Sequence, residues 1–104
     1  MNTTTNTLQK LKEAGEVFMP GHRACIGCGE VLAMRQVFKT LGKDTIVACA
    51  TGCMEIISSP FPTTNWSIPW IHALFENTAA VAAGIESGLD AMKRKGRGPA
   101  QEVT

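Results

Sequence analysis

Two cysteines separated by two residues, set in a glycine-rich stretch, constrain this chain more than any other feature of its sequence. The stretch reads Gly21-His22-Arg23-Ala24-Cys25-Ile26-Gly27-Cys28-Gly29-Glu30. A Cys-x-x-Cys turn brings both sulfurs to one metal centre without strain, and glycine supplies the backbone angles that inward-turning amides need. An apolar run with helical spacing starts at Glu30. The turn is therefore predicted to lie at a helix N-terminus, where free amides and the helix dipole favour an anionic group.

Composition narrows the class of protein. The chain has 104 residues, which suits one small domain. Its net charge of +1 gives no reason to expect a nucleic acid or a membrane surface as partner. The polar start Met1–Thr5 lacks the shape of a signal peptide, and no apolar stretch is long enough to span a bilayer. We therefore expect a cytoplasmic protein whose four cysteines serve metal binding or redox chemistry before structural disulfides.

The first half of the chain predicts helices followed by a buried strand. A short helix is expected over Leu8–Ala14, behind a polar tail, and a longer one over Glu30–Leu41, each followed by a glycine. Between the two helices, Val17–Gly21 is expected to be extended, because Pro20 disfavours helix there. Thr45–Ala50 is a continuous apolar and β-branched run, which is typical of a strand buried on both faces of a parallel sheet.

The second half predicts one long helix. Met54–Ser59 suits a turn of helix, and Pro60–Trp70, with three prolines, predicts an ordered apolar loop or an edge segment. Ile71–Lys95 is predicted to be helical, with its regular part starting near Asn77 or Thr78. Gln101–Thr104 predicts the start of another strand. Because one such unit cannot cover its own sheet, we expect the chain to pair with other polypeptides or to be the first part of a longer subunit.

The four cysteines permit two metal chemistries. Cys25, Cys28, Cys49 and Cys53 are enough for a tetrahedral zinc site, and some or all of them suit an iron–sulfur cluster. Cys49 lies inside the predicted strand, whereas Cys53 follows it past a glycine. If Cys53 reaches the centre, Cys49 packs in the core, and three thiolates are too few for either metal. A small non-catalytic zinc-binding module that uses all four cysteines is the alternative interpretation.

Three motifs together resemble the β subunit of 2-oxoacid:ferredoxin oxidoreductases, and most closely its pyruvate:ferredoxin oxidoreductase (pyruvate synthase) branch. They are the stretch Gly21–Glu30, the sequence Ala50-Thr51-Gly52-Cys53, and the sequence Trp70-Ile71-His72-Ala73-Leu74-Phe75-Glu76-Asn77 before an Ala/Gly-rich helix. The resemblance implies an α/β fold of the thiamine diphosphate-binding type with a largely parallel sheet. Residues 1–104 would then be the N-terminal part of one domain, with a tail and short helix over 1–17 and the cluster loop, helix, strand and long helix over 18–104.

The resemblance also implies a site. It assigns Cys25, Cys28 and Cys53 as ligands of a [4Fe–4S] cluster, with the fourth ligand outside this chain and no ligand role for Cys49. It places Glu30 and the Gly52–Cys53 loop against thiamine diphosphate. The ligands of the Mg²⁺ ion that holds the diphosphate are expected beyond Thr104.

The activity that the resemblance implies is oxidative decarboxylation of a 2-oxoacid, with pyruvate as the expected substrate. The products would be an acyl-CoA and electrons that pass through the cluster to ferredoxin. The same resemblance also allows the reverse, synthase direction of this reaction. The implied partners are coenzyme A, ferredoxin and further subunits of α, γ and δ type in a hetero-oligomer. His22 and His72 each stand alone in the sequence, so we predict hydrogen-bonded structural roles for both.

Overall fold

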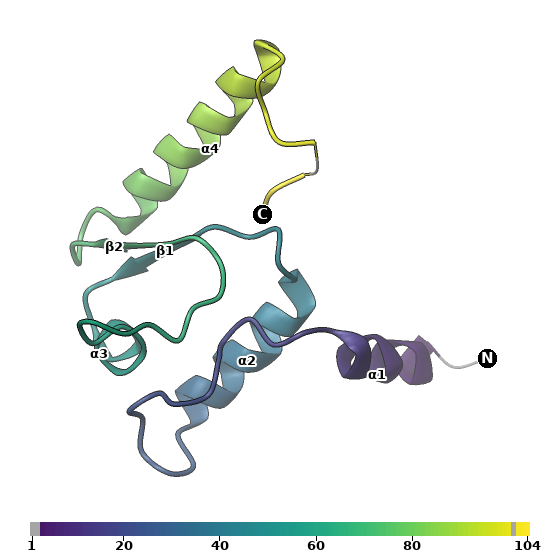
Figure 1. Cartoon of the computed structure of the whole chain (residues 1–104), viewed down its shortest axis with the longest axis vertical. Coiled ribbons are helices and arrows are strands. Elements are labelled where there is room, and N and C mark those ends of the chain that lie inside the picture. Colours follow the sequence, from purple (N-terminus) through teal and green to yellow (C-terminus); the bar gives the residue numbers. More distant parts are fainter. Residues whose placement is uncertain (1–2, 101) are drawn as a thin grey trace.

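The computed structural model describes residues 3–100 and 102–104 of the chain. Four helices and two strands follow one another as α1 (Thr3–Glu13), α2 (Gly29–Leu41), β1 (Val47–Ala50), α3 (Cys53–Ser58), β2 (Trp70–Ala73) and α4 (Thr78–Arg94) (Figure 1). This order confirms a mixed α/β chain. None of the described helices is long and apolar enough to cross a membrane.

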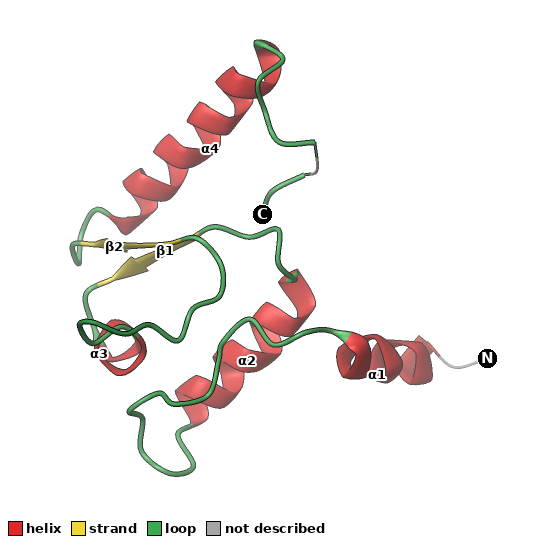
Figure 2. Ribbon diagram, viewed as in Figure 1, coloured by secondary structure: helices red, strands yellow, loops and turns green. Residues whose placement is uncertain are grey.

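β1 and β2 form a parallel two-stranded sheet, joined through α3 (Figure 2). The register pairs Val47 with Trp70 and Cys49 with His72. Two backbone hydrogen bonds extend this pairing at its ends, from Val47 N–H to the Pro69 carbonyl (2.9 Å) and from Thr51 N–H to the Ala73 carbonyl (3.0 Å). A strand, a helical crossover and a second parallel strand make a βαβ unit. The first strand, predicted over Thr45–Ala50, is observed over Val47–Ala50, where its residues are half-buried and not buried on both faces.

Helices lie on both sides of this sheet. Figure 1 shows α4 on one side of the strands and α2 and α3 on the other. The core occupies the α2 and α3 side, where Phe38 and Phe18 meet the Trp66 ring edge-on, each with ring centroids 5.0 Å apart. The Trp66 indole N–H donates to the buried hydroxyl of Ser58 (2.9 Å). The members of the core cluster are Val17, Phe18, Val31, Phe38, Trp66 and Ile68.

An antiparallel contact between two distant segments closes this core. Phe18 and Trp66 form an isolated bridge, flanked by hydrogen bonds from Met19 N–H to the Asn65 carbonyl (2.7 Å) and from Ser67 N–H to the Val17 carbonyl (3.1 Å). The extended conformation predicted for the residues before the cysteine turn is therefore confirmed. The loop over 60–69, rich in proline, is ordered because Asn65, Trp66 and Ile68 are buried.

Three of the sequence predictions need correction. The helix predicted over Ile71–Lys95 begins at Thr78, which confirms the predicted start of its regular part, but the first residues of the predicted range are wrong because Trp70–Ala73 extends as a strand paired with β1. Helix α1 starts at Thr3 rather than Leu8, so Thr3–Asn6 is helical instead of tail, whereas Met1 and Asn2 lie outside the described residues.

The third correction concerns the strand predicted over Gln101–Thr104. Gln101 lies outside the described residues, and 102–104 carry no strand assignment. Thr104 nevertheless exchanges backbone hydrogen bonds with the residues that lead into β1.

Candidate functional site

Cys25 and Cys28 lie on one tight turn that leads directly into α2. Cys28 N–H donates to the Cys25 carbonyl (3.1 Å), which closes the turn, and the Cys28 carbonyl accepts from Leu32 N–H (3.3 Å) as the first hydrogen bond of the helix. Gly27 has φ +77°, in the left-handed region that favours glycine. Cys28 is half-buried against the core and Cys25 is exposed. The predicted arrangement of a Cys-x-x-Cys turn at a helix N-terminus is thus confirmed.

The chain that enters this turn is held by buried and half-buried groups. The Asn65 side-chain amide donates to the carbonyls of Met19 (3.1 Å) and Pro20 (2.9 Å). His22 stacks on Phe18 with ring centroids 5.6 Å apart, and its Nδ1 accepts from Ala24 N–H (3.3 Å). The structural role predicted for His22 is therefore confirmed. These contacts fix the cysteine turn to the buried part of the 60–69 loop.

Cys53 lies at the carboxyl end of β1, where ligands bind in open α/β sheets. It is the first residue of α3, immediately after Gly52, and its thiol is exposed. The cysteine turn contacts the same helix at its far end, because Arg23 N–H donates to the Ile57 carbonyl (3.0 Å). One short helix therefore connects the two places where the predicted cluster ligands lie.

The donor chemistry of these cysteines fits an iron–sulfur cluster only in part. All three thiols are free, and thiolates are the ligands such clusters prefer. Within residues 3–100 and 102–104, however, no group of three or more His, Cys, Asp or Glu side chains is placed to hold one metal ion. Cys25 and Cys28 share one turn, whereas Cys53 lies at the start of α3.

Cys49 differs from the other three cysteines in its surroundings. It is a half-buried residue of β1, opposite His72 in the sheet. Burial raises the pKa of the Cys49 thiol, the Trp70 side chain opposes that shift, and the negative charges of Glu55 and Glu30 add to it. Cys49 therefore stays a protonated thiol more readily than an ordinary cysteine, which disfavours it as a metal ligand.

Glu30 occupies the first turn of α2, as its position after the cysteine pair predicts. It is exposed, and its charge raises the pKa of the Cys49 thiol on β1.

The sequence prediction missed one polar pair at this strand end. The Thr51 hydroxyl lies 2.7 Å from His72 Nε2 and also donates to the Ala73 carbonyl (3.2 Å). His72 stacks on Trp70 with ring centroids 6.1 Å apart. The pair confirms the prediction that His72 is hydrogen-bonded. Its partner, Thr51, could not be predicted, because the two residues meet only through the pairing of Trp70–Ala73 with β1.

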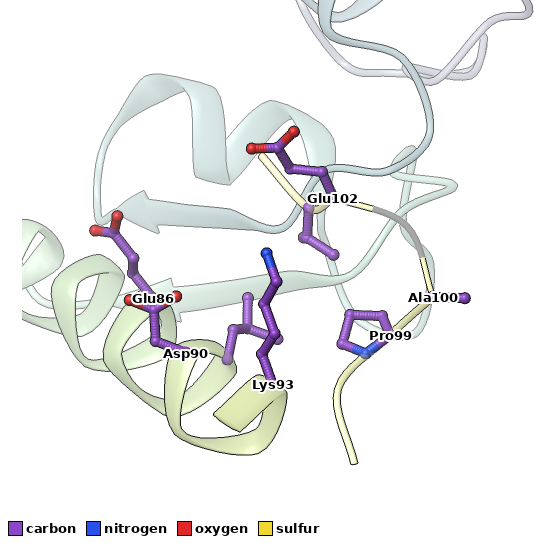
Figure 3. A pocket seen from close by; sticks show the side chains of 8 residues that line it. Glu86, Asp90, Lys93, Pro99, Ala100 and Glu102 are labelled. Atoms are coloured by element: carbon purple, nitrogen blue, oxygen red, sulfur yellow. The ribbon is translucent and has the colours of Figure 1, made fainter. Parts of the chain in front are cut away.

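Two hollows in the surface contrast in chemistry. A shallow hollow of about 280 Å³ lies over the cysteine turn and is lined by Cys25, Cys28 and Arg35, among others. Figure 3 shows a second hollow of about 220 Å³, lined by Glu86, Asp90 and Lys93 of α4 and by Glu102 of the C-terminal segment. None of the predicted site residues lines this second hollow.

Comparison with known proteins identifies relatives but no family model that matches the chain. Pyruvate synthase subunit PorB of Methanocaldococcus jannaschii is 54% identical over 80 residues, which is 77% of this chain and 27% of the relative. PorB of Methanothermobacter marburgensis is 50% identical over 88 residues, or 85% of this chain and 30% of the relative. Ketoisovalerate oxidoreductase subunit VorB of Pyrococcus horikoshii is 42% identical over 83 residues, or 80% of this chain and 27% of the relative.

This chain therefore spans 27–30% of the length of these curated relatives. The match nevertheless covers more than three quarters of the chain at 42–54% identity. Over the matched stretch, this chain belongs to the family of PorB-type subunits of 2-oxoacid oxidoreductases.

Proposed function

We propose that this chain is the N-terminal segment of the β subunit of a 2-oxoacid:ferredoxin oxidoreductase of the pyruvate synthase type. The observation that carries the proposal is the joint occurrence of high identity to PorB and a Cys-x-x-Cys turn fixed at the start of α2. The chain supplies part of the active unit, and other subunits, coenzyme A and ferredoxin supply the rest.

Cys25, Cys28 and Cys53 are the proposed protein ligands of a [4Fe–4S] cluster. The first two lie on one turn, and the third lies on α3, which contacts that turn through the hydrogen bond from Arg23 to Ile57. Binding of all three thiolates to one cluster would require the start of α3 to move toward the turn. The fourth ligand is proposed to come from outside residues 1–104.

Glu30 and the Gly52–Cys53 loop are the proposed contacts of this chain with thiamine diphosphate. Gly52 and Cys53 follow the carboxyl end of β1, where ligands bind in open α/β sheets, and Glu30 lies in the first turn of α2, directly after the cysteine turn. When bound, thiamine diphosphate supplies the carbon chemistry of decarboxylation and the cluster supplies one-electron transfer. This chain positions the two groups, tunes the cluster through backbone amides and burial, and leaves the Mg²⁺ ligands to residues beyond Thr104.

Pyruvate is the proposed substrate. The pyruvate synthase subunits of Methanocaldococcus jannaschii and Methanothermobacter marburgensis are 54% and 50% identical to this chain, against 42% for the ketoisovalerate oxidoreductase subunit. Because both names occur among the relatives, the assay below compares pyruvate with ketoisovalerate.

The test is a 2-oxoacid-dependent reduction assay on the complete complex, purified without oxygen. We expect reduction of ferredoxin that requires coenzyme A and is faster with pyruvate than with ketoisovalerate. A Cys25→Ser complex should lose this activity, whereas Cys49→Ser, the matched control, should keep most of it. A complex that contains zinc in place of iron and reduces no acceptor would contradict the proposal and favour the four-cysteine zinc module.

A further inference from the structure

Thr51, the residue directly before the Gly52–Cys53 loop, is hydrogen-bonded to the end of β2 through both its backbone and its side chain. Thr51 N–H donates to the Ala73 carbonyl (3.0 Å), and the Thr51 hydroxyl donates to the same carbonyl (3.2 Å). A further bond joins Thr51 Oγ1 to His72 Nε2, which lies 2.7 Å away. The strand end from which the loop departs is therefore fixed on β2.

The number of hydrogen atoms in this arrangement identifies the donor of the Thr51–His72 bond. A threonine hydroxyl carries a single hydrogen, and a carbonyl oxygen can only accept. The Thr51 hydrogen is directed to the Ala73 carbonyl, so the hydrogen between Thr51 and His72 is carried by His72 Nε2. His72 is therefore the donor, and it acts on the side chain of Thr51.

The His72 ring is itself held in place on the sheet. It stacks on Trp70 with ring centroids 6.1 Å apart and an interplanar angle of 27°, and the indole nitrogen of Trp70 is buried. Because Cys49 is the register partner of His72, Thr51 two residues further on lies on the same face of the sheet. The His72 side chain is exposed, so water competes for its hydrogen bond and the bond adds little to global stability. These surroundings suit a local role at the strand end.

The residues that follow Thr51 have few contacts of their own. Gly52 is extended, and a Cβ placed on it would meet no atom within 4 Å. The Cys53 thiol is exposed at the start of α3. Glycine permits backbone rotation that other residues resist, so Gly52 is where the backbone can turn when the start of α3 moves toward the cysteine turn. Thr51 is the fixed point for that movement.

We propose that His72 is a positioning residue for the Gly52–Cys53 loop. By donating from Nε2–H to Thr51 Oγ1, it fixes the strand end from which Cys53 reaches the cluster and Gly52 approaches thiamine diphosphate. His72 acts through Thr51 and touches neither group. The inference rests on the proposed function, because Cys53 is a cluster ligand only there.

Two pairs of variants and a matched control test this role. His72→Phe keeps a ring on Trp70 but removes the donor, and Thr51→Val keeps the branched shape but removes the hydroxyl. His72→Gln and Thr51→Ser keep the groups that the bond requires and should rescue it. Thr45→Val is the control, because it also removes a threonine hydroxyl, one that donates to the Gly42 carbonyl (3.1 Å) before β1 and away from the loop.

The first measurement is residue-resolved amide hydrogen exchange on the complete protein, which requires neither cluster nor thiamine diphosphate. His72→Phe should raise the exchange rate of the Thr51 amide about fivefold, the effect of losing one hydrogen bond. His72→Gln should leave the rate within about twofold of the parent protein. An unchanged rate in His72→Phe would overturn the proposal.

The second measurement is the rate at which an iron chelator removes iron from the anaerobic complex, counted for the centre that Cys25→Ser lacks. His72→Phe and Thr51→Val should lose iron about fivefold faster than the parent complex. The two rescue variants should match the parent, and Thr45→Val should match it even where its melting temperature is lower.

Two results of the chelator experiment would refute the positioning role alone. One is an iron-containing parent complex with unchanged iron loss in His72→Phe, and the other is equally fast loss in Thr45→Val, which would make the effect one of general stability. A parent complex without iron would refute the proposed function, and this inference with it. The iron content of the parent complex therefore separates the two failures.

Discussion

Gly27 is the residue on which the geometry of the cysteine turn depends most directly. Its φ of +77° is strained for any residue with a side chain, yet a Cβ placed there would meet no atom within 4 Å. The requirement for glycine is therefore conformational and not steric. Gly29, two residues on, also has open space around it but an ordinary backbone conformation as the first residue of α2. Gly27 and Gly29 therefore form a matched pair for alanine substitution, because they differ in backbone conformation and not in the space around them.

Substituting them separates backbone strain from the loss of chain flexibility. Gly27→Ala should lower the free energy of unfolding by about 1–2 kcal/mol, because the left-handed conformation is costly for alanine. Gly29→Ala should leave stability unchanged or raise it by up to about 1 kcal/mol, because alanine restricts the unfolded chain and favours helix. Urea denaturation of both variants measures the difference. Equal free energies of unfolding would mean that the turn relaxes and does not need the conformation of Gly27.

Among the elements, α2 is joined to the segment before the cysteine turn by a three-residue ion pair. The Glu16 carboxylate lies 2.9 Å from the Arg35 guanidinium and 2.8 Å from the Lys39 ammonium. Hydrogen bonds to Arg35 and Lys39 lower the pKa of Glu16. Because the Glu16 and Arg35 side chains are 36% and 46% exposed, solvent screens the pair, and its contribution to stability is at most about 1 kcal/mol.

The pH dependence of this stabilisation follows from the direction of the pKa shift of Glu16. Because the pKa of Glu16 is lower in the folded state, the ion pair stabilises the fold fully at pH values above the ordinary glutamate pKa of about 4.3. This stabilisation is lost as the pH falls through the lowered pKa of the folded state. Glu16→Gln should therefore be less stable than the parent protein at pH 7 and match it in acid. Thermal unfolding between pH 7 and pH 3 measures this, with Glu13→Gln at an exposed position of α1 as control. A Glu16→Gln deficit that persists in acid would contradict the account.

The elements also show what the sequence can predict and what it cannot. The spacing of Val31, Met34 and Phe38 predicted α2 to within one residue, because one helix face packs on the core. β2 was missed since Trp70–Ala73 is too short to show a strand period, and its apolar residues also fit a helix. What makes it a strand is pairing with β1, more than twenty residues earlier, a tertiary contact that local pattern does not contain.

At the scale of the whole molecule, the candidate site was predictable in its parts but not in its assembly. The cysteine turn is local and was predicted from Cys-x-x-Cys and two glycines. The pairing of Thr51 with His72 joins two strands, and the position of Cys53 relative to the turn depends on how α3 packs. Neither relation is encoded in spacing along the chain, so both required the folded structure.

The proposed function depends most on one assignment, that Cys25 and Cys28, and not Cys49, are ligands of a metal centre. The most direct measurement is iron and acid-labile sulfide per chain in the anaerobically purified complex, compared for the parent protein, Cys25→Ser and Cys49→Ser. The account predicts about four irons and four sulfides attributable to this centre in the parent protein. It predicts the same content in Cys49→Ser and loss of the centre in Cys25→Ser. Zinc in place of iron, or loss of metal in Cys49→Ser, would contradict it.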